Sequence, residues 1–261
     1  MQIKEIDGGK EFDWGKTSED YAKYRDIYPK EFYDKIVERN LCIKGQKVLD
    51  LGTGTGVLPR NMYMYGAEWT GIDISENQIL QAKKMSKECN QNIEYYVMAT
   101  EEVTCPKDSF DVITDCKCFC YFDNEQVIPK LAKMLKRGGK MLILYMEWLP
   151  LEDAVAESSE KLILKYNPNW SGAGKRKHPL FVSEHVHKWF EVTYQQEYDL
   201  DVPFTRDTWS GRVKACRGIG ASLTDEEVIA WEKEHKALLE KITTKEFAVK
   251  HQMRMMELRK K

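Results

Sequence analysis

The residues best suited to chemistry lie in a glycine-rich turn at residues 50–56, with the sequence DLGTGTG. Alternate glycines let a backbone turn tightly and come close to a ligand, and the N-terminus of a following helix adds a positive end. A dinucleotide fingerprint, GxGxxG, would need a third glycine at position 57, where the chain has Val57. The residues expected to make the ligand turn are Asp50, Gly52, Thr53, Gly54 and Gly56.

The elements that must position this turn alternate between strand and helix signals from residue 46 to residue 146. Such alternation predicts a doubly wound α/β fold, a mostly parallel sheet with helices on both faces. A capping box, Ser75 with Gln78, begins one helix. A later helix, with apolar residues at helical spacing from 127 to 135, is expected to end at residues 136–139, where two basic residues precede two glycines. Strands are expected at residues 46–51, 69–73, 93–98, 110–114 and 140–146.

The alternation stops after residue 147. Residues 148–188, with the basic run KRKH at 175–178, are expected to form a loop-rich insertion whose basic run is solvated. A strand at 190–198 and helices at 205–217 and 224–242 should follow, the second helix with a capping box of Thr224 and Glu227. The last strand is expected within residues 247–258.

The order and spacing of these motifs resemble the class I S-adenosylmethionine-dependent methyltransferases, in particular small-molecule enzymes of the type 11 kind. Their motif is a strand ending D/E-x-G-x-G-x-G, then an acidic residue closing the next strand, and Asp50 and Asp73 occupy these places. The resemblance covers residues 45–146. It implies S-adenosylmethionine as cofactor, in-line methyl transfer, and a Rossmann-like sheet of seven strands with an antiparallel last strand.

The resemblance also implies which side chains meet the cofactor. Asp73 would take the ribose hydroxyls, since a carboxylate offers two oxygens to two vicinal hydroxyls. Glu101 would meet the adenine amino group, with a solvated carboxylate as the alternative. The other residues implied at this site are Ile74, Gln78, Ala99, Thr100 and Cys116.

An aromatic stripe precedes the motif. Tyr21, Tyr24, Arg25 and Tyr28 fall at i, i+3, i+4 and i+7, on one helical face that should end before Pro29. In similar enzymes such a segment closes over the cofactor, and here Tyr21 would face the sulfonium and Arg25 the methionine carboxylate. Core packing is the alternative. We therefore expect a helical lid at 1–40, a Rossmann-like core at 41–147, and a substrate-side insertion with C-terminal helices and the last strands at 148–261.

Two segments are expected on the substrate side. In the segment after the fourth strand, Cys116, Cys118 and Cys120 alternate and would point the same way if extended. They would act either as thiols that handle a thiophilic substrate or as small hydrophobic side chains. Further on, Trp209 and Arg212 share a helical face, where a guanidinium needs an internal carboxylate or an anionic substrate group. The expected substrate-side residues are Trp14, Cys118, Tyr121, Trp148, Trp209 and Arg212.

Composition narrows the class of partner. The 261 residues carry 40 basic and 42 acidic side chains, a net charge of −2, which disfavours nucleic acid. The chain lacks a membrane-length apolar run, an N-terminal secretory segment, a metal-ligand motif and a disulfide framework, so we expect a cytoplasmic protein without membrane or metal.

The expected function is transfer of a methyl group from S-adenosylmethionine to a small molecule with an anionic group. No catalytic base is assigned, because an activated sulfonium mainly needs alignment and exclusion of water. The alternatives are a non-catalytic S-adenosylmethionine-binding protein and an NAD-dependent oxidoreductase. The sequence specifies neither the acceptor atom nor the oligomeric state.

Overall fold

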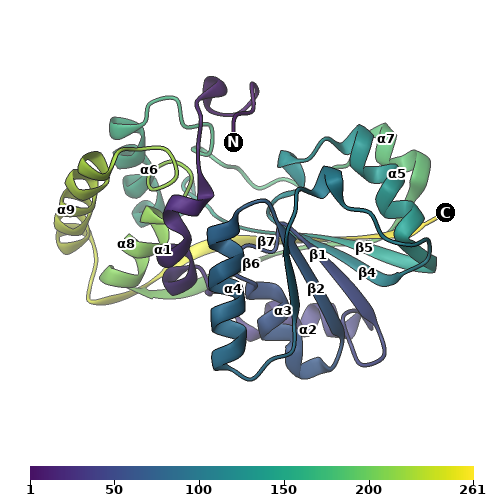
Figure 1. The fold of residues 1–261 in the computed structure, drawn as a ribbon. Coiled ribbons are helices and arrows are strands. Elements are labelled where there is room, and N and C mark those ends of the chain that lie inside the picture. Colours follow the sequence, from purple (N-terminus) through teal and green to yellow (C-terminus); the bar gives the residue numbers. More distant parts are fainter. The chain divides into compact units, whose positions relative to one another are not determined.

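Seven strands form one sheet in the order β3-β2-β1-β4-β5-β7-β6 (Figure 1). The computed structural model describes all residues, 1–261. The pairs β1–β2, β1–β4, β2–β3 and β4–β5 are parallel, and the sheet has one antiparallel hairpin. The predicted α/β class with seven strands is therefore confirmed. The strands are β1 (Lys47–Leu51), β2 (Glu68–Asp73), β3 (Glu94–Val97), β4 (Phe110–Cys116), β5 (Leu135–Trp148), β6 (Phe190–Thr205) and β7 (Glu246–Lys260).

Nine α-helices and five short 3-10 turns connect these strands. The helices are α1 (Ser18–Tyr24), α2 (Lys30–Glu38), α3 (Val57–Met62), α4 (Glu76–Glu88), α5 (Asn124–Met134), α6 (Ala154–Tyr166), α7 (Glu184–Trp189), α8 (Arg206–Lys214) and α9 (Asp225–Ile242). The 3-10 turns are η1 (Asp7–Gly9), η2 (Trp14–Thr17), η3 (Tyr63–Tyr65), η4 (Thr100–Glu102) and η5 (Phe119–Tyr121). None of the helices combines the length and apolar character that crossing a bilayer requires.

The chain divides into two compact units, each built from three separate segments. Unit 1 comprises Met1–Ile27, Glu147–His178 and Asp199–Gln252, and unit 2 comprises Tyr28–Met146, Pro179–Tyr198 and Met253–Lys261. Unit 2 carries the glycine turn. Its main core joins β1, β4 and β5 to α5 and α7, and Figure 1 shows these two helices side by side next to β4 and β5.

In unit 1, helices α1, α6, α8 and α9 pack together around fully buried aromatic side chains, Trp209 and Trp231. His235 of α9 is buried beside them, with its two ring nitrogens 3.1 Å from Ser210 Oγ and 3.0 Å from Ser159 Oγ. Burial lowers the pKa of His235 to about 3, so its imidazole is neutral. This polar network satisfies a buried histidine and joins three helices.

The N-terminal segment is part of unit 1 because its polar groups bond to residues far along the chain. The Asp7 carboxylate accepts from Ser171 N–H at 2.7 Å and pairs with Arg217. A Cβ at Gly211 would collide with the ring of Tyr24, so glycine in α8 permits α1 to lie this close. For Tyr24, these contacts favour core packing over the lid interpretation.

The predicted aromatic face is wrong in one respect, because α1 ends at Tyr24 and Tyr28 does not continue it. Residues 26–29 are not helical, as expected for a segment that leads into Pro29, since a residue before proline is driven from the α region. Tyr28 instead packs on Phe32 in unit 2, with ring centroids 4.6 Å apart.

Two further local predictions are corrected. The expected loop-rich insertion contains the 13-residue helix α6, which Asp153 caps by accepting from Val155 N–H and Ala156 N–H, both at 2.9 Å. Helix α5 ends at Met134 rather than at residues 136–139. Leu135 already pairs with Phe110, so the cationic and glycine residues form an irregularity at the start of β5 and not a helix end.

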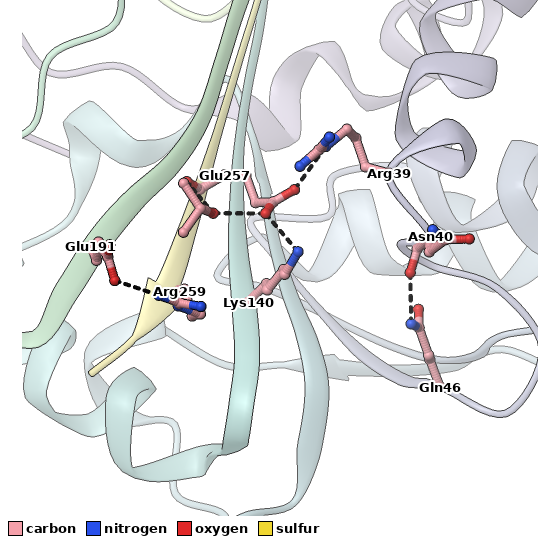
Figure 2. Close-up of polar contacts among 8 residues, drawn as sticks. Arg39, Asn40, Gln46, Lys140, Glu191, Glu257 and Arg259 are labelled. Atoms are coloured by element: carbon pink, nitrogen blue, oxygen red, sulfur yellow. Dashed lines mark hydrogen bonds and ion pairs between the residues drawn. The ribbon is translucent and has the colours of Figure 1, made fainter.

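A buried carboxylate fixes the part of strand β7 that belongs to unit 2 (Figure 2). The side chain of Glu257 is 0% exposed, and its oxygens accept from Lys140 Nζ at 2.6 Å, Thr193 Oγ1 at 2.7 Å and Arg39 Nε at 3.1 Å. Burial alone would oppose ionisation, but these hydrogen bonds lower the pKa of Glu257. One side chain thus links β7 to β5, β6 and the end of α2.

We predict that Glu257→Gln lowers the free energy of unfolding by about 3 kcal/mol at pH 7, because it leaves two cations without their carboxylate. Glu191→Gln is the matched control, since it breaks the exposed pair with Arg259, also drawn in Figure 2, and should cost at most about 1 kcal/mol. A carboxyl with a lowered folded pKa stabilises above its unfolded pKa, so the Glu257→Gln deficit should shrink below about pH 4. Urea unfolding checks this, and equal deficits in the two variants would contradict it.

Candidate functional site

The glycine turn takes its shape from three residues in the left-handed region. Gly52, Gly54 and Gly56 follow β1 with φ of 56°, 56° and 72°. Side chains with a Cβ are strained in this region, so the alternate glycines are explained by backbone geometry. Val57 is then the first residue of α3, with Gly56 at its N-cap.

Neighbouring side chains press directly against two of these glycines. A Cβ on Gly52 would lie 2.5 Å from Cys118 Sγ, and one on Gly56 would overlap the phenol of Tyr95 in β3. The N–H of Thr53 donates to Ile72 O at 2.8 Å. The turn is therefore held by β2, by β3 and by the segment after β4.

Asp73, the last residue of β2, bridges the turn to the next helix. Its Oδ2 accepts from Gly54 N–H at 2.9 Å, and its Oδ1 accepts from Ser75 N–H at 2.8 Å. Burial raises the pKa of Asp73, which these two bonds oppose. Each carboxylate oxygen keeps a further lone pair, so Asp73 can still accept from the hydroxyls of a ligand.

Asp50 lies below the turn and is buried. Its Oδ2 accepts from Thr53 Oγ1 at 2.7 Å and its Oδ1 from Thr114 Oγ1 at 2.6 Å. Burial raises the pKa of Asp50 to about 6 despite these bonds. Both oxygens thus support the turn and β4, while a contact with the cofactor stays a prediction.

The other cofactor residues expected in unit 2 follow the carboxyl ends of β2, β3 and β4. Ile74 is 58% exposed, and Ser75 caps α4 by accepting from the N–H of Gln78. This is one half of the expected capping box, because the N–H of Ser75 donates to Asp73 instead of to Gln78. Ala99 and Thr100 lie at the start of η4. Because β2 and β4 lie on opposite sides of β1, the strand order reverses here, and open α/β sheets bind ligands at such a point.

Glu101 has a local partner that sequence reasoning missed. Its Oε1 accepts from Asp123 N–H at 3.0 Å, and Asp123 in turn caps α5. The carboxylate is therefore not simply solvated, because one of its oxygens helps to hold the start of α5. Its expected contact with the adenine amino group stays a prediction.

The cysteine segment differs from the prediction because it is not extended. Cys116 ends β4, and Lys117 takes a left-handed φ of 71°, so the three cysteines do not lie along one extended strand. Cys116 Sγ lies 3.4 Å from Tyr28 Oη, and Cys118 Sγ lies 3.1 Å from Leu51 O. Tyr121 closes the short turn η5, its N–H bonded to Cys118 O at 2.8 Å.

The environment of these thiols disfavours a nucleophilic role. Burial raises the pKa of Cys116 to about 12 and that of Cys118 well above its ordinary value, so both stay protonated near neutral pH. A thiol of this kind acts as a small apolar group and weak donor, which is the second of the two interpretations offered by the sequence.

In unit 1 the expected residues form two aromatic–guanidinium groups. Arg25 stacks on Tyr21, 4.5 Å from its ring centroid, and Tyr21 meets Trp14 edge to face at 6.2 Å. Arg212 stacks on Trp148 at 4.9 Å and is 3% exposed. Stacking holds the plane of a guanidinium while its N–H groups point outward in that plane.

Two side chains of α6 form hydrogen bonds with Trp148 and with Trp209, whose ring packs edge to face against that of Trp148. Trp148 Nε1 donates to Glu160 Oε1 at 2.6 Å, and Trp209 Nε1 donates to Ser159 Oγ at 2.9 Å. Sequence reasoning missed both residues because it placed no helix at 154–166. The cap at Asp153 followed by apolar residues at helical spacing was the available signal.

We predict that Gly56→Ala lowers the free energy of unfolding by about 3 kcal/mol, from left-handed strain of about 1–2 kcal/mol plus crowding against Tyr95. The matched control is Gly138→Ala, at a φ of 75° with no atom within 4 Å of its added Cβ, which isolates the strain. Chemical unfolding of both variants measures the difference. If both lose the same amount, the close approach of Tyr95 has no energetic role.

Solved structures share this fold. The YcgJ protein from Bacillus subtilis aligns with a TM-score of 0.54 at 19% identity, covering 89% of this chain and all of that one. The cyclase SpnF aligns with a TM-score of 0.51 at 17% identity, covering 87% and 78% of the two chains. Since a cyclase also has this fold, the fold alone does not decide the reaction.

Curated relatives match a little under half of the chain. Ubiquinone biosynthesis O-methyltransferase from Coxiella burnetii is 34% identical over 108 residues, 41% of this chain and 46% of the relative. The protein of that name from Chromobacterium violaceum is 31% identical over 128 residues, 48% and 54% of the two. The chain spans about half the length of the curated relatives it matches.

A sequence profile of the family described as "Methyltransferase domain" matches residues 43–199, more than half of the chain. The matched region contains the glycine turn, Asp73 and the segment after β4, the features on which the resemblance was based. The chain therefore belongs to the methyltransferase domain family, which confirms the resemblance of its motifs to the class I S-adenosylmethionine-dependent methyltransferases.

Proposed function

We propose that this chain transfers a methyl group from S-adenosylmethionine to a small-molecule acceptor. The observation that carries the proposal is the turn of three left-handed glycines, joined to the start of α4 by Asp73. The surrounding residues fit the cofactor. Asp73 keeps acceptor sites for ribose hydroxyls, and Ile74 has an exposed apolar side chain that would pack on an adenine ring. Thr55 Oγ1 is buried without a protein partner, so the turn also offers an unused polar group.

When bound, the sulfonium supplies an already activated methyl group. The task of the chain is then to bind, to orient and to exclude water. Asp73 and the bare glycine backbone would hold the nucleoside, with Glu101 at the adenine edge. Within unit 1, Arg25 is stacked on Tyr21, and its contact with the methionine carboxylate stays a prediction.

For the acceptor, a hydroxyl is the first class to test, because the curated relatives are named O-methyltransferases.

On the substrate side we assign Arg212 to an anionic group, with Trp148 and Trp209 as apolar walls. Arg212 is buried and stacks on the ring of Trp148. A buried fork suits a carboxylate or phosphate on a small molecule. A cytoplasmic location is part of the proposal, because the cysteines lack the spacing of a disulfide framework.

We predict that S-adenosylmethionine and S-adenosylhomocysteine each raise the melting temperature by several degrees. At a ligand concentration of about 100 times Kd, linkage adds about 2.7 kcal/mol to the stability of the folded state. Differential scanning fluorimetry with both ligands and with NAD measures this.

Asp73→Ala is the control for that experiment. It removes the acceptor of the ribose hydroxyls and also frees Gly54 N–H, so affinity should fall by roughly ten- to a hundredfold, as for the loss of a charge-assisted hydrogen bond. A shift with NAD alone, or the same shift in Asp73→Ala as in the wild type, would overturn the proposed cofactor site.

We predict that Arg212→Lys leaves S-adenosylmethionine binding intact and lowers kcat/KM by the equivalent of about 2–4 kcal/mol, since lysine keeps the charge but loses the planar fork. An acceptor found in a screen that detects S-adenosylhomocysteine allows the measurement. Cofactor affinity and melting temperature are determined on the same preparation.

A structural role for Arg212 gives a different pattern. The variant would then melt earlier, and its activity would follow the folded fraction. A destabilised variant whose folded fraction is fully active would remove Arg212 from substrate recognition.

A further inference from the structure

Three carboxylates gather at the carboxyl ends of neighbouring strands in unit 2. Asp50 belongs to β1, Asp73 ends β2 and Asp115 lies near the end of β4. The strands β2, β1 and β4 are adjacent, and Leu51 pairs with both Ile72 and Asp115. The side chains of Asp50 and Asp115 are buried below the glycine turn.

Every hydrogen-bond donor to these three carboxylates is neutral. Asp115 accepts from Cys118 N–H at 3.3 Å and lies 3.0 Å from Cys118 Sγ. Asp50 accepts from two threonine hydroxyls, and Asp73 accepts from two backbone N–H groups. None of the three forms an ion pair, so their negative charge is balanced by dipoles alone.

The buried pair titrates near neutral pH. Burial raises the pKa of Asp50 to about 6 and that of Asp115 to about 7, and the charge of Asp50 adds to the effect on Asp115. The thiols and the phenol packed around the pair are uncharged at these pH values, because burial raises their pKa values. The charged and titratable neighbours are Asp73, the thiols of Cys42, Cys116 and Cys118, the phenol of Tyr95, and the cations Lys117 and Arg60, which act on Cys116 and Tyr95.

We propose that Asp50 and Asp115 make the site selective for the charge on the cofactor's sulfur, so that it prefers the sulfonium of S-adenosylmethionine to the neutral thioether of S-adenosylhomocysteine. The site itself is defined by the glycine turn and Asp73, and the inference rests on the proposed function. Two fixed carboxylates in a medium of low dielectric attract a nearby cation more strongly than they would in water. Methyl transfer removes that cation, and the product then loses the attraction.

The two ligands make the comparison clean. S-Adenosylmethionine and S-adenosylhomocysteine share the adenosine, the ammonium and the carboxylate, and they differ by one methyl group and one positive charge. Their affinity ratio therefore cancels general damage to the site and reports the charge on sulfur. Raising the pH ionises the pair and should favour the cation, while lowering it should remove the preference.

Isothermal titration calorimetry of both ligands tests this on the wild type, Asp115→Asn and Asp111→Asn. Asp111 is the matched control. It lies on β4 like Asp115, four residues and about 13 Å before it along the strand, and its carboxylate forms an ion pair with Lys136. We expect the ratio Kd(S-adenosylhomocysteine)/Kd(S-adenosylmethionine) to fall about tenfold in Asp115→Asn at pH 8, about 1.4 kcal/mol. The wild-type ratio should fall likewise between pH 8 and pH 6, and Asp111→Asn should match the wild type.

The outcomes separate the two proposals. If neither ligand binds the wild type, the proposed cofactor fails. If both bind and their ratio is the same at pH 6 and pH 8, or the same in Asp115→Asn as in Asp111→Asn, charge selection is overturned. If Asp115→Asn no longer folds, Asp50→Asn and the wild-type pH series decide, and an unchanged ratio in both overturns the proposal.

Discussion

The carboxylate of Asp73 is the interaction on which the geometry of the candidate cofactor site depends. It accepts from Gly54 in the turn after β1 and from Ser75 at the start of α4, so one side chain sets the separation of two loops that no covalent bond joins. On either side of Gly54, Gly52 and Gly56 can approach Cys118 and Tyr95 only because they have no Cβ. The acid at the end of β2 therefore holds the middle of a turn whose two flanking glycines are fixed by packing.

The parts that could be predicted from sequence are those with a strong local cause. The alternate glycines and the cap at Ser75 indicate their own geometry, because positive φ and exposed helix N–H groups admit few residue types. Thr224 and Glu227 form the expected capping box. The βαβ rhythm predicted the sheet because parallel strands need helical crossovers.

The parts that could not be predicted depend on contacts distant in sequence or on weak local signals. Glu257 contacts Arg39 and Lys140 only in the folded chain. The residues next to it in sequence therefore do not predict that it is buried. Alternate spacing places Cys116 and Cys118 on one side only if the backbone between them is extended. The left-handed φ of Lys117 shows that it is not. Helix α6 was missed because the glycines and basic residues that follow it indicate a loop, and the N-cap signal at Asp153 was given too little weight.

The composition of unit 1 has a consequence for how the protein is made. Its first segment ends at Ile27, yet Asp7 bonds to Ser171 and Arg217, and Asp13 N–H donates to Ala221 O at 2.8 Å. A ribosome adds about 5–20 residues per second, so the N-terminal segment emerges roughly ten seconds or more before these partners exist. Unit 2 likewise cannot complete its fold until the end of β7 has been synthesised. Folding of this chain is therefore largely post-translational, and its early aromatic residues stay exposed to chaperones until the C-terminal third has been synthesised.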